Sequence, residues 1–430
     1  MNSPLTNPYI KPPKDDTKNF SPRIGFAYDM TGSGKFLLRG GFGLYYGNIF
    51  QNIPLFMVQQ ANATLFQQSL SISGSDAVPG TSKTLANWQY GIDPLPAIPA
   101  PSSLLNVGSV GRIMDPNYKN PVTEEFNVGT SWQVTNRSAI ELEYVHVLGL
   151  HENRTINIDQ KVCTDDGAGG TTCTRPLDAA FAASGLPRLN SIRNEESIGR
   201  SHYDGMNLSY RQQMTHHFSI NANYTLSWAY SYDAGGSSFR NYPRLATDPF
   251  ASYEWGPSPN DERHHISLSG IVDLGKGFQF SPILQFGTAR PYNPTSATNV
   301  LDTGGGTANA VIVPNSDITN YLAFSGNDAG ARYCFYVTKQ CTIAKFDPLR
   351  GDKFFQLDTR LAKNFKLGET RNLQLIAQFL NLTNRANYGN NYHNDVQSSD
   401  NFGTPAGFIN PTSTTLPRSF QSEFGARFTF

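Results

Sequence analysis

The sequence is short of charge and of long apolar runs. Charged residues make up 16% of the 430 residues, and 34 Lys and Arg balance 34 Asp and Glu. A chain without a basic excess lacks the electrostatic footprint of a nucleic-acid-binding protein. No stretch approaches the roughly eighteen consecutive apolar residues of a transmembrane helix. We therefore expect no nucleic acid among its partners and no helical membrane span.

Catalytic motifs and metal-site signatures are also missing. No Ser/His/Asp set, pair of catalytic carboxylates or nucleotide fingerprint stands out. Two histidine pairs, His216 with His217 and His264 with His265, are poor chelates, because neighbouring residues of a strand point to opposite faces. The sequence therefore predicts no enzyme activity, no catalytic residue, no cofactor and no metal site.

Cysteine is scarce, and its four residues form two local pairs: Cys163 with Cys173, and Cys334 with Cys341. Neither pair has CxxC spacing or histidines at the spacing of a zinc site. Each pair closes a short polar interval typical of an exposed loop, so we interpret both as disulfides formed in an oxidising compartment. Four unpaired thiols are the alternative. Each disulfide would stabilise its loop by roughly 2–3 kcal/mol.

Aromatic residues are abundant, with 20 Tyr and 28 Phe, and they follow an alternating pattern. In the segment 218–230, apolar and polar residues alternate throughout. A period of two predicts a strand with one apolar and one polar face. The same alternation predicts ten further strands, at Arg23–Asp29, Phe36–Tyr46, Phe126–Val134, Ala139–Leu148, Tyr203–Gln213, His265–Leu274, Phe278–Phe286, Phe355–Phe365, Leu373–Asn381 and Phe420–Phe430.

Short and long connections alternate between these strands. Tight turns are predicted at 31–34, 135–137, 215–217, 275–277 and 366–370. Long polar loops occupy about 51–120, 151–200, 232–262, 291–352 and 389–417. Short turns at one end and long loops at the other are typical of an antiparallel transmembrane β-barrel in the outer membrane. The polar face would then form a solvated lumen wall carrying Arg39, Glu141, Glu143, Arg211, Asp358, Arg360 and Arg427.

Six segments resemble the C-terminal barrel half of TonB-dependent outer-membrane transporters, in particular the Oar-like group. They are FSPRIGFAYD (20–29), GSGKFLLRGGFGLYYG (32–47), NPVTEEFNVGTSWQV (120–134), SIGRSHYDGMNLSYRQQ (197–213), NLQLIAQFLNLTNRANYG (372–389) and FGARFTF (424–430). Their order and spacing resemble the family across nearly the whole chain. The resemblance implies a 22-stranded barrel that is plugged by an N-terminal domain.

The eleven predicted strands are half of that number, and single-chain bacterial barrels have even strand counts. We therefore expect residues 1–430 to be the C-terminal part of a barrel, without the plug domain, the signal peptide or the TonB box. The resemblance implies a receptor of the bacterial outer membrane that takes up a scarce nutrient: an oligosaccharide, a peptide or a metal chelate. It implies four partners: outer-membrane lipid, the barrel-assembly machinery, the substrate, and the TonB system acting through the missing plug.

Two sets of residues are candidate functional positions. The loop aromatics Trp88, Tyr90, Tyr253 and Trp255 could stack on a sugar or a peptide. The terminal strand resembles the signal by which barrels are recognised for insertion, with Phe424, Phe428 and Phe430 on one face.

Two other architectures stay open. One is a soluble, secreted, all-β carbohydrate-binding protein, although no fixed repeat of a propeller is found. The other is a smaller, complete, porin-like barrel of twelve strands, with one strand hidden in 51–120 or 291–352.

Overall fold

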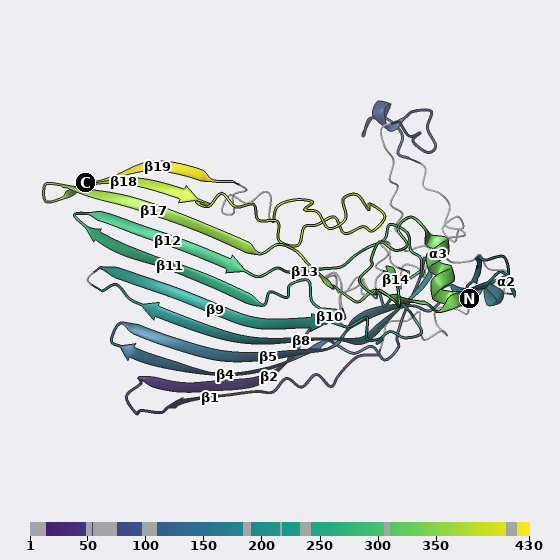
Figure 1. Ribbon diagram of the computed structural model, residues 1–430, viewed down its shortest axis with the longest axis horizontal. Coiled ribbons are helices and arrows are strands. Elements are labelled where there is room, and N and C mark those ends of the chain that lie inside the picture. Colours follow the sequence, from purple (N-terminus) through teal and green to yellow (C-terminus); the bar gives the residue numbers. More distant parts are fainter. Residues whose placement is uncertain are drawn as a thin grey trace.

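The computed structural model describes residues 14–48, 54, 75–96, 110–183, 191–215, 217–232, 242–304, 310–409 and 419–430. In these residues, eleven long strands form one antiparallel sheet, in which each strand pairs with the next one along the chain (Figure 1). They are β1 (Arg23–Asp29), β2 (Phe36–Tyr46), β4 (Val122–Thr135), β5 (Ser138–Asn157), β8 (Ser191–Gln212), β9 (Phe218–Ser231), β11 (His264–Gly275), β12 (Phe278–Gly287), β17 (Phe354–Leu367), β18 (Arg371–Leu380) and β19 (Gln421–Thr429). The eleven predicted strands and the antiparallel all-β class are confirmed.

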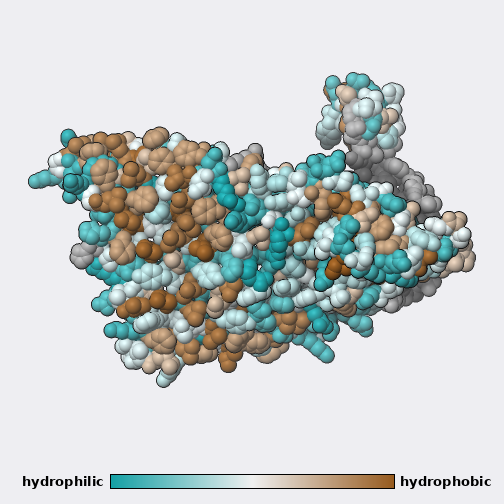
Figure 2. All heavy atoms as spheres, in the orientation of Figure 1, coloured by the Kyte–Doolittle hydropathy of each residue, from teal (hydrophilic) through white to brown (hydrophobic). Residues whose placement is uncertain are grey.

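The register gives the sheet two chemically different sides. Phe42 lies opposite Phe126 between β2 and β4, and Leu268 lies opposite Leu284 between β11 and β12. We call this side the apolar face; many of its large side chains are exposed, Phe126 by 44%. Figure 2 shows broad hydrophobic patches over the strands. An exposed apolar surface of this extent indicates an apolar environment or partner.

The other side, which we call the polar face, carries the charges predicted for a lumen wall. Arg39 lies opposite Gly129, which lies opposite Glu143, so this row crosses three strands on one side. Arg360 lies opposite Gln378, which lies opposite Glu423. The same register puts all seven predicted wall charges on the polar face.

The turn between β1 and β2 shows why its sequence forms a hairpin. Asp29 accepts hydrogen bonds from the backbone N–H groups of Thr31, at 3.0 Å, and Gly34, at 2.6 Å. Gly34 has φ +73°, a left-handed conformation that costs a glycine little. The carboxylate and the glycine together reverse the chain within a few residues.

Strands β5 and β8 run farther than the alternation predicts, over 20 and 22 residues. Bulges interrupt their pairing near Leu150 and Glu152. Beyond the bulges, Arg154, Thr155 and Ile156 are all buried. The two-face pattern ends there because both sides of the strands are covered, so the periodicity could not show this extension.

The sheet is open at both edges in the described part of the chain. β1 pairs only with β2, and β19 pairs only with β18. Since every step from β1 to β19 along the sheet order is antiparallel, and eleven strands give an even number of steps, the two edge strands run in the same direction. The C-terminus lies at the end of the short turns (Figure 1).

The long connections form a layer beyond the other end of the sheet (Figure 1). Among the described residues, hydrophobic clusters form in this layer around Leu301 and Ile343 and around Val313 and Val396. No helix in the described residues is long and apolar enough to cross a membrane. The remaining elements are η3 (Leu85–Asn87), β3 (Val110–Met114), β6 (Val162–Asp165), β7 (Thr171–Thr174), α2 (Asp178–Ala183), β10 (Gly256–Pro257), β13 (Pro291–Tyr292), β14 (Ile312–Pro314), α3 (Asp328–Arg332), the π-helical η5 (Tyr333–Thr338), β15 (Cys341–Ile343) and β16 (Leu349–Arg350).

Candidate functional site

The polar face holds a hollow of about 1030 Å³. β8, β9, β11, β12, β17, β18 and β19 all contribute to its wall. Amide and hydroxyl side chains dominate, and the charged members are two arginines and two carboxylates. The polar side chains of the wall are Arg211, Gln212, Gln213, Ser219, Asn221, Ser269, Ser281, Gln285, Gln356, Asp358, Thr359, Arg360, Gln378 and Glu423.

The charged side chains of this wall differ in their hydrogen-bond and ion-pair partners. Asp358 accepts hydrogen bonds from the backbone N–H of Asn381, at 2.7 Å, and from the Gln356 amide, at 2.8 Å. Arg211 and Arg360 are exposed to the hollow. In the described residues neither guanidinium has an ion-pair partner. The arrangement can bind and orient a polar solute, and it lacks the paired acid, base and nucleophile of a catalytic centre.

A buried ion triad joins the long loops above the sheet. Glu254 accepts hydrogen bonds from Arg154 Nη2, at 2.8 Å, and from Arg244 Nε, at 3.1 Å. All three side chains are at least 97% buried. Arg244 also donates to the carbonyl of Ala344, at 2.8 Å, so the outer end of β5 and two long loops meet at this triad. Isolated charged residues have no periodic signature, so local sequence patterns do not indicate this contact.

Both predicted cysteine pairs are disulfides in the structure. Cys163 and Cys173 link β6 to β7, and Cys334 and Cys341 link η5 to β15. The described residues contain no free cysteine.

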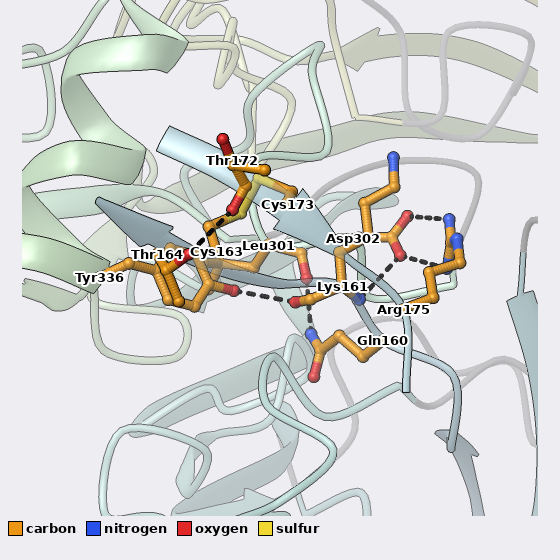
Figure 3. The surroundings of a disulfide bond; sticks show 10 residues. All are labelled: Gln160, Lys161, Cys163, Thr164, Thr172, Cys173, Arg175, Leu301, Asp302 and Tyr336. Carbon is orange, nitrogen blue, oxygen red and sulfur yellow. Dashed lines mark hydrogen bonds and ion pairs between the residues drawn. A yellow bond between two sulfur atoms is a disulfide. The ribbon is translucent and has the colours of Figure 1, made fainter. Parts of the chain in front are cut away.

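The first disulfide lies in a network that ties two loops together (Figure 3). Arg175 forms an ion pair with Asp302 at 2.6 Å. The Tyr336 hydroxyl donates to the carbonyl of Lys161, at 3.2 Å. Burial, with a contribution from Asp302, raises the pKa of Tyr336 to about 12. The loops therefore pack as one layer rather than as separate arms.

Two of the four predicted ligand-contact aromatics pack against neighbouring side chains, and their role in ligand binding stays a prediction. Tyr253 packs against the Leu301 cluster, and burial raises its pKa to about 12. Trp255 stacks against His202, at 5.5 Å between ring centroids, and Tyr230, at 6.4 Å. The register puts both partners on the apolar face, and neither Tyr253 nor Trp255 lines the hollow.

The other two aromatics lie in a separate lobe, residues 75–96, which stands away from the loop layer (Figure 1). Trp88 Nε1 donates to the carbonyl of Pro94 at 2.9 Å, and the ring meets Tyr90 edge-on. Tyr90 is 83% exposed. The structure thus brings the four predicted residues to three places, and only Trp88 and Tyr90 remain close together. Their role in ligand binding stays a prediction.

The aromatic residues of the terminal strand share the apolar face. Phe424 is 77% exposed and meets Phe379 of β18 edge-on. Phe428 and Phe430 lie 6.1 Å apart between ring centroids, with Phe430 92% exposed. In the part of the chain that the structure describes, no three His, Cys, Asp or Glu side chains are placed to hold a metal ion.

A family model described as "outer membrane beta barrel domain" matches residues 8–421. Similar solved structures include the outer membrane transporter YddB from Escherichia coli, at 13% identity and TM-score 0.45, with 95% of this chain and 40% of that chain covered. The siderophore receptor PirA from Acinetobacter baumannii is 9% identical, with a TM-score of 0.44, and the match covers 95% of this chain and 40% of that chain.

The ferric-catecholate import receptor Fiu from E. coli K12 gives 10% identity and TM-score 0.40, with 95% of this chain and 34% of that chain covered. The chain thus spans about a third to two fifths of the length of these three proteins. No curated protein matches the sequence.

Proposed function

Because the chain belongs to the family of outer membrane beta barrel domains, we propose that it forms part of the wall of a receptor that takes up a solute through a gated barrel. The protein is located in the outer membrane. The observation that carries the proposal is the two-faced sheet, with an exposed apolar face and a polar face that is hollowed over about 1030 Å³. Uptake of this kind requires binding of the solute and gating of the barrel, and no covalent bond is formed or broken. Membership of this family and the outer-membrane location exclude the alternative of a soluble carbohydrate-binding protein.

The open edges support the proposal that residues 1–430 are the C-terminal part of a larger barrel. In lipid, an unpaired strand edge leaves backbone groups without hydrogen bonds, so the sheet must be completed. β1 and β19 run in the same direction, and pairing them directly would create a parallel seam. If an odd number of further strands closes the barrel, β1 and β19 each pair antiparallel with their new neighbours. The eleven strands missing from a 22-stranded barrel satisfy this condition.

The alternative of a complete twelve-stranded barrel needs one more wall strand in 51–120 or 291–352. In the described residues of these segments no strand extends the wall. β3 pairs in parallel with the outer end of β8, away from both open edges. The strand β14 pairs with β15 inside the loop layer.

We extend the proposal to partners. A plug domain preceding this part of the barrel would connect the receptor to TonB, and the substrate would be an oligosaccharide, a peptide or a metal chelate. Uptake can be measured in cells that carry the intact gene, with and without active TonB, using a labelled maltooligosaccharide, a labelled octapeptide and a ferric catecholate as probes. Gene-dependent and TonB-dependent accumulation of one probe is the expected result. Accumulation equal to that of cells without the gene, for all three, contradicts uptake of these classes.

The terminal aromatics fit a role in assembly. We infer that Phe424, Phe428 and Phe430 are read by the barrel-assembly machinery, since all three are exposed on the apolar face of the last strand. Deletion of Phe430 is expected to lower the amount of full-length protein inserted into the outer membrane. Unchanged insertion of the deletion variant would refute that role.

A further inference from the structure

The apolar face carries a group of polar and charged side chains on three neighbouring strands, β4, β5 and β8. Phe126 of this face lies opposite His146, and His146 lies opposite Asp204. Since side chains of a strand alternate between its two sides, residues at even spacings from these three share the face. We call the polar members the polar sector; they are Glu124, Tyr144, His146, Arg200, His202 and Asp204.

The polar sector reaches into the depth of the membrane. Trp132 and Tyr210 lie on the apolar face near the short turns, in a row joined through Ile140, and such rings gather where hydrocarbon meets headgroups. Asp204 is six residues from Tyr210 along β8, which is about 20 Å along the strand and about 15 Å in height at the usual tilt. The apolar band of an outer-membrane barrel is about 25 Å tall. The Asp204 carboxylate therefore lies inside this band.

Other strands carry no charge at the corresponding positions. In the described strands β1, β2, β12 and β17, the half of the apolar face toward the long loops is lined by side chains such as Ile24, Phe42, Leu284, Phe286 and Leu357. Lipid surrounds all strands of a barrel alike, so it does not explain why polarity is confined to one group of them. Ionisable groups at membrane depth are costly and mark functional contacts. The polar sector therefore indicates a protein partner on this side of the barrel.

Two charges of the polar sector are left without a partner inside the chain. Asp204 accepts a hydrogen bond from the Tyr144 hydroxyl and lies beside His146 Nδ1, both at 2.7 Å. In contrast, the Glu124 carboxylate and the Arg200 guanidinium form no hydrogen bond or ion pair in the described residues. The strand β5 separates them, and the register offsets them by two residues, so their Cα atoms are about 12 Å apart. One free anion and one free cation thus lie on the same surface.

We propose that a second copy of this protein docks on the polar sector, so that Glu124 of each copy pairs with the partner's Arg200. Both copies insert into the membrane in the same direction, so a two-fold axis along the membrane normal brings the same surface of each together. Such an interface requires a surface that is complementary to itself, and one free carboxylate with one free guanidinium meets this requirement. A partner with charges of one sign would neutralise only one of the two groups.

Apolar side chains complete the proposed interface. Phe126 is 44% exposed and Met206 is 38% exposed, and both lie on the apolar face within the same strands. They supply the contact area around the ion pairs, and a guanidinium can bind a carboxylate through two parallel hydrogen bonds. The proposal rests on the outer-membrane location and not on uptake of a solute.

The test uses the protein expressed from its intact gene and inserted into lipid vesicles. Copies labelled with donor and acceptor fluorophores report self-association by energy transfer as the protein-to-lipid ratio rises. The variants are the charge reversals Glu124→Arg and Arg200→Glu, measured alone and as a mixture of the two. Arg371→Glu is the matched control, because Arg371 is exposed on the apolar face at the end of the short turns, opposite Leu367. The β signal in circular dichroism verifies that each variant is folded.

We expect the wild type to self-associate and each single reversal to weaken self-association by about a hundredfold, because like charges then meet in both contacts of the dimer. The mixture of Glu124→Arg with Arg200→Glu should associate as strongly as the wild type. In that mixed dimer, each contact again joins opposite charges. Arg371→Glu should associate like the wild type.

Three results overturn the proposal. The first is a wild type that stays monomeric at every protein-to-lipid ratio, whatever solute it takes up. The second is a mixture that associates no better than the single variants, since the two charges would then act within one chain or on a different protein. The third is an equal loss of association in Arg371→Glu, which would mean that the charge of the whole face, rather than the polar sector, controls association.

Discussion

The sheet and the loop layer of this protein are stabilised in opposite ways. In the sheet, large apolar side chains such as Phe126 and Leu268 are exposed, and order comes from the backbone ladder of eleven strands. In the loop layer, Leu301 and Val313 are fully buried, and Glu254 pairs there with the buried Arg154 from the outer end of β5. The sheet therefore depends on lipid around it, whereas the loop layer carries its own core, ion pairs and disulfides. Damage to one region should leave the other largely intact.

The strongest test of this comparison is Glu254→Gln. The substitution leaves Arg154 and Arg244 buried without a counter-charge, and breaking a buried ion pair in this way costs about 3–5 kcal/mol. We expect hydrogen exchange to accelerate in residues 242–262 and 341–346, while strands β9 to β12 keep their protection. Hydrogen exchange read by mass spectrometry measures both regions in one sample.

Glu423→Gln is the control for that substitution, because Glu423 is an exposed carboxylate of the sheet. It should change exchange in neither region. If Glu254→Gln also loosened β9 to β12, the two regions would form one cooperative unit and the comparison would fail.

A pair of adjacent positions tests the sheet in the same manner. Leu268 lies on the apolar face, and Ser269 lines the hollow of the polar face. An arginine on the lipid side costs about 2–4 kcal/mol near the middle of the bilayer, whereas an arginine in the lumen stays hydrated. We expect Leu268→Arg to lower the midpoint of urea unfolding in lipid vesicles strongly and Ser269→Arg to lower it little. Equal effects of the two would show that the faces are assigned wrongly.

Removal of the disulfide in the first long loop is expected to have the next largest effect. Replacing both Cys163 and Cys173 with Ser should destabilise the loop layer by about 2–3 kcal/mol, since the closed loop is short. Limited proteolysis should then cut within residues 158–183 at a lower protease concentration. The variant with Ser at Cys334 and Cys341 is the matched comparison. A sheet that became sensitive to protease in either variant would contradict independent stabilisation.

The sequence predicts the sheet well and the loop layer poorly, and the reason is physical. A single-layer sheet between lipid and water shows both of its faces, so alternation in a segment such as Phe218–Ser231 reports the structure directly. The triad of Arg154, Arg244 and Glu254 depends on contact between β5 and a loop about 100 residues farther along the chain, and local patterns do not indicate it. Trp255 illustrates the same limit, because its residue type alone does not indicate that its ring packs on His202 and Tyr230 of the apolar face.

The smallest expected effect concerns Glu195, in the part of β8 that pairs with β3. The residue is 97% buried, and its carboxyl accepts hydrogen bonds from Thr155 Oγ1, at 2.6 Å, and Asn153 Nδ2, at 3.0 Å. Burial raises the pKa of Glu195 above its ordinary 4.5 despite these bonds and the nearby Arg112. The folded state thus prefers the protonated form, so this group stabilises folding fully at pH below 4.5 and loses that contribution as the pH rises through the folded pKa.

Glu195→Gln keeps an acceptor for Thr155 and removes the titration. In the wild type, the thermal midpoint of the loop layer should therefore fall from pH 4.5 to pH 8 by more than it does in Glu195→Gln. The midpoint of the sheet should show the same pH dependence in both proteins, because Glu195 lies outside the lipid-facing surface. A pH dependence of the loop layer that is identical in the two proteins would mean that the Glu195 carboxyl is ionised in the fold without cost, and that its hydrogen bonds outweigh its burial.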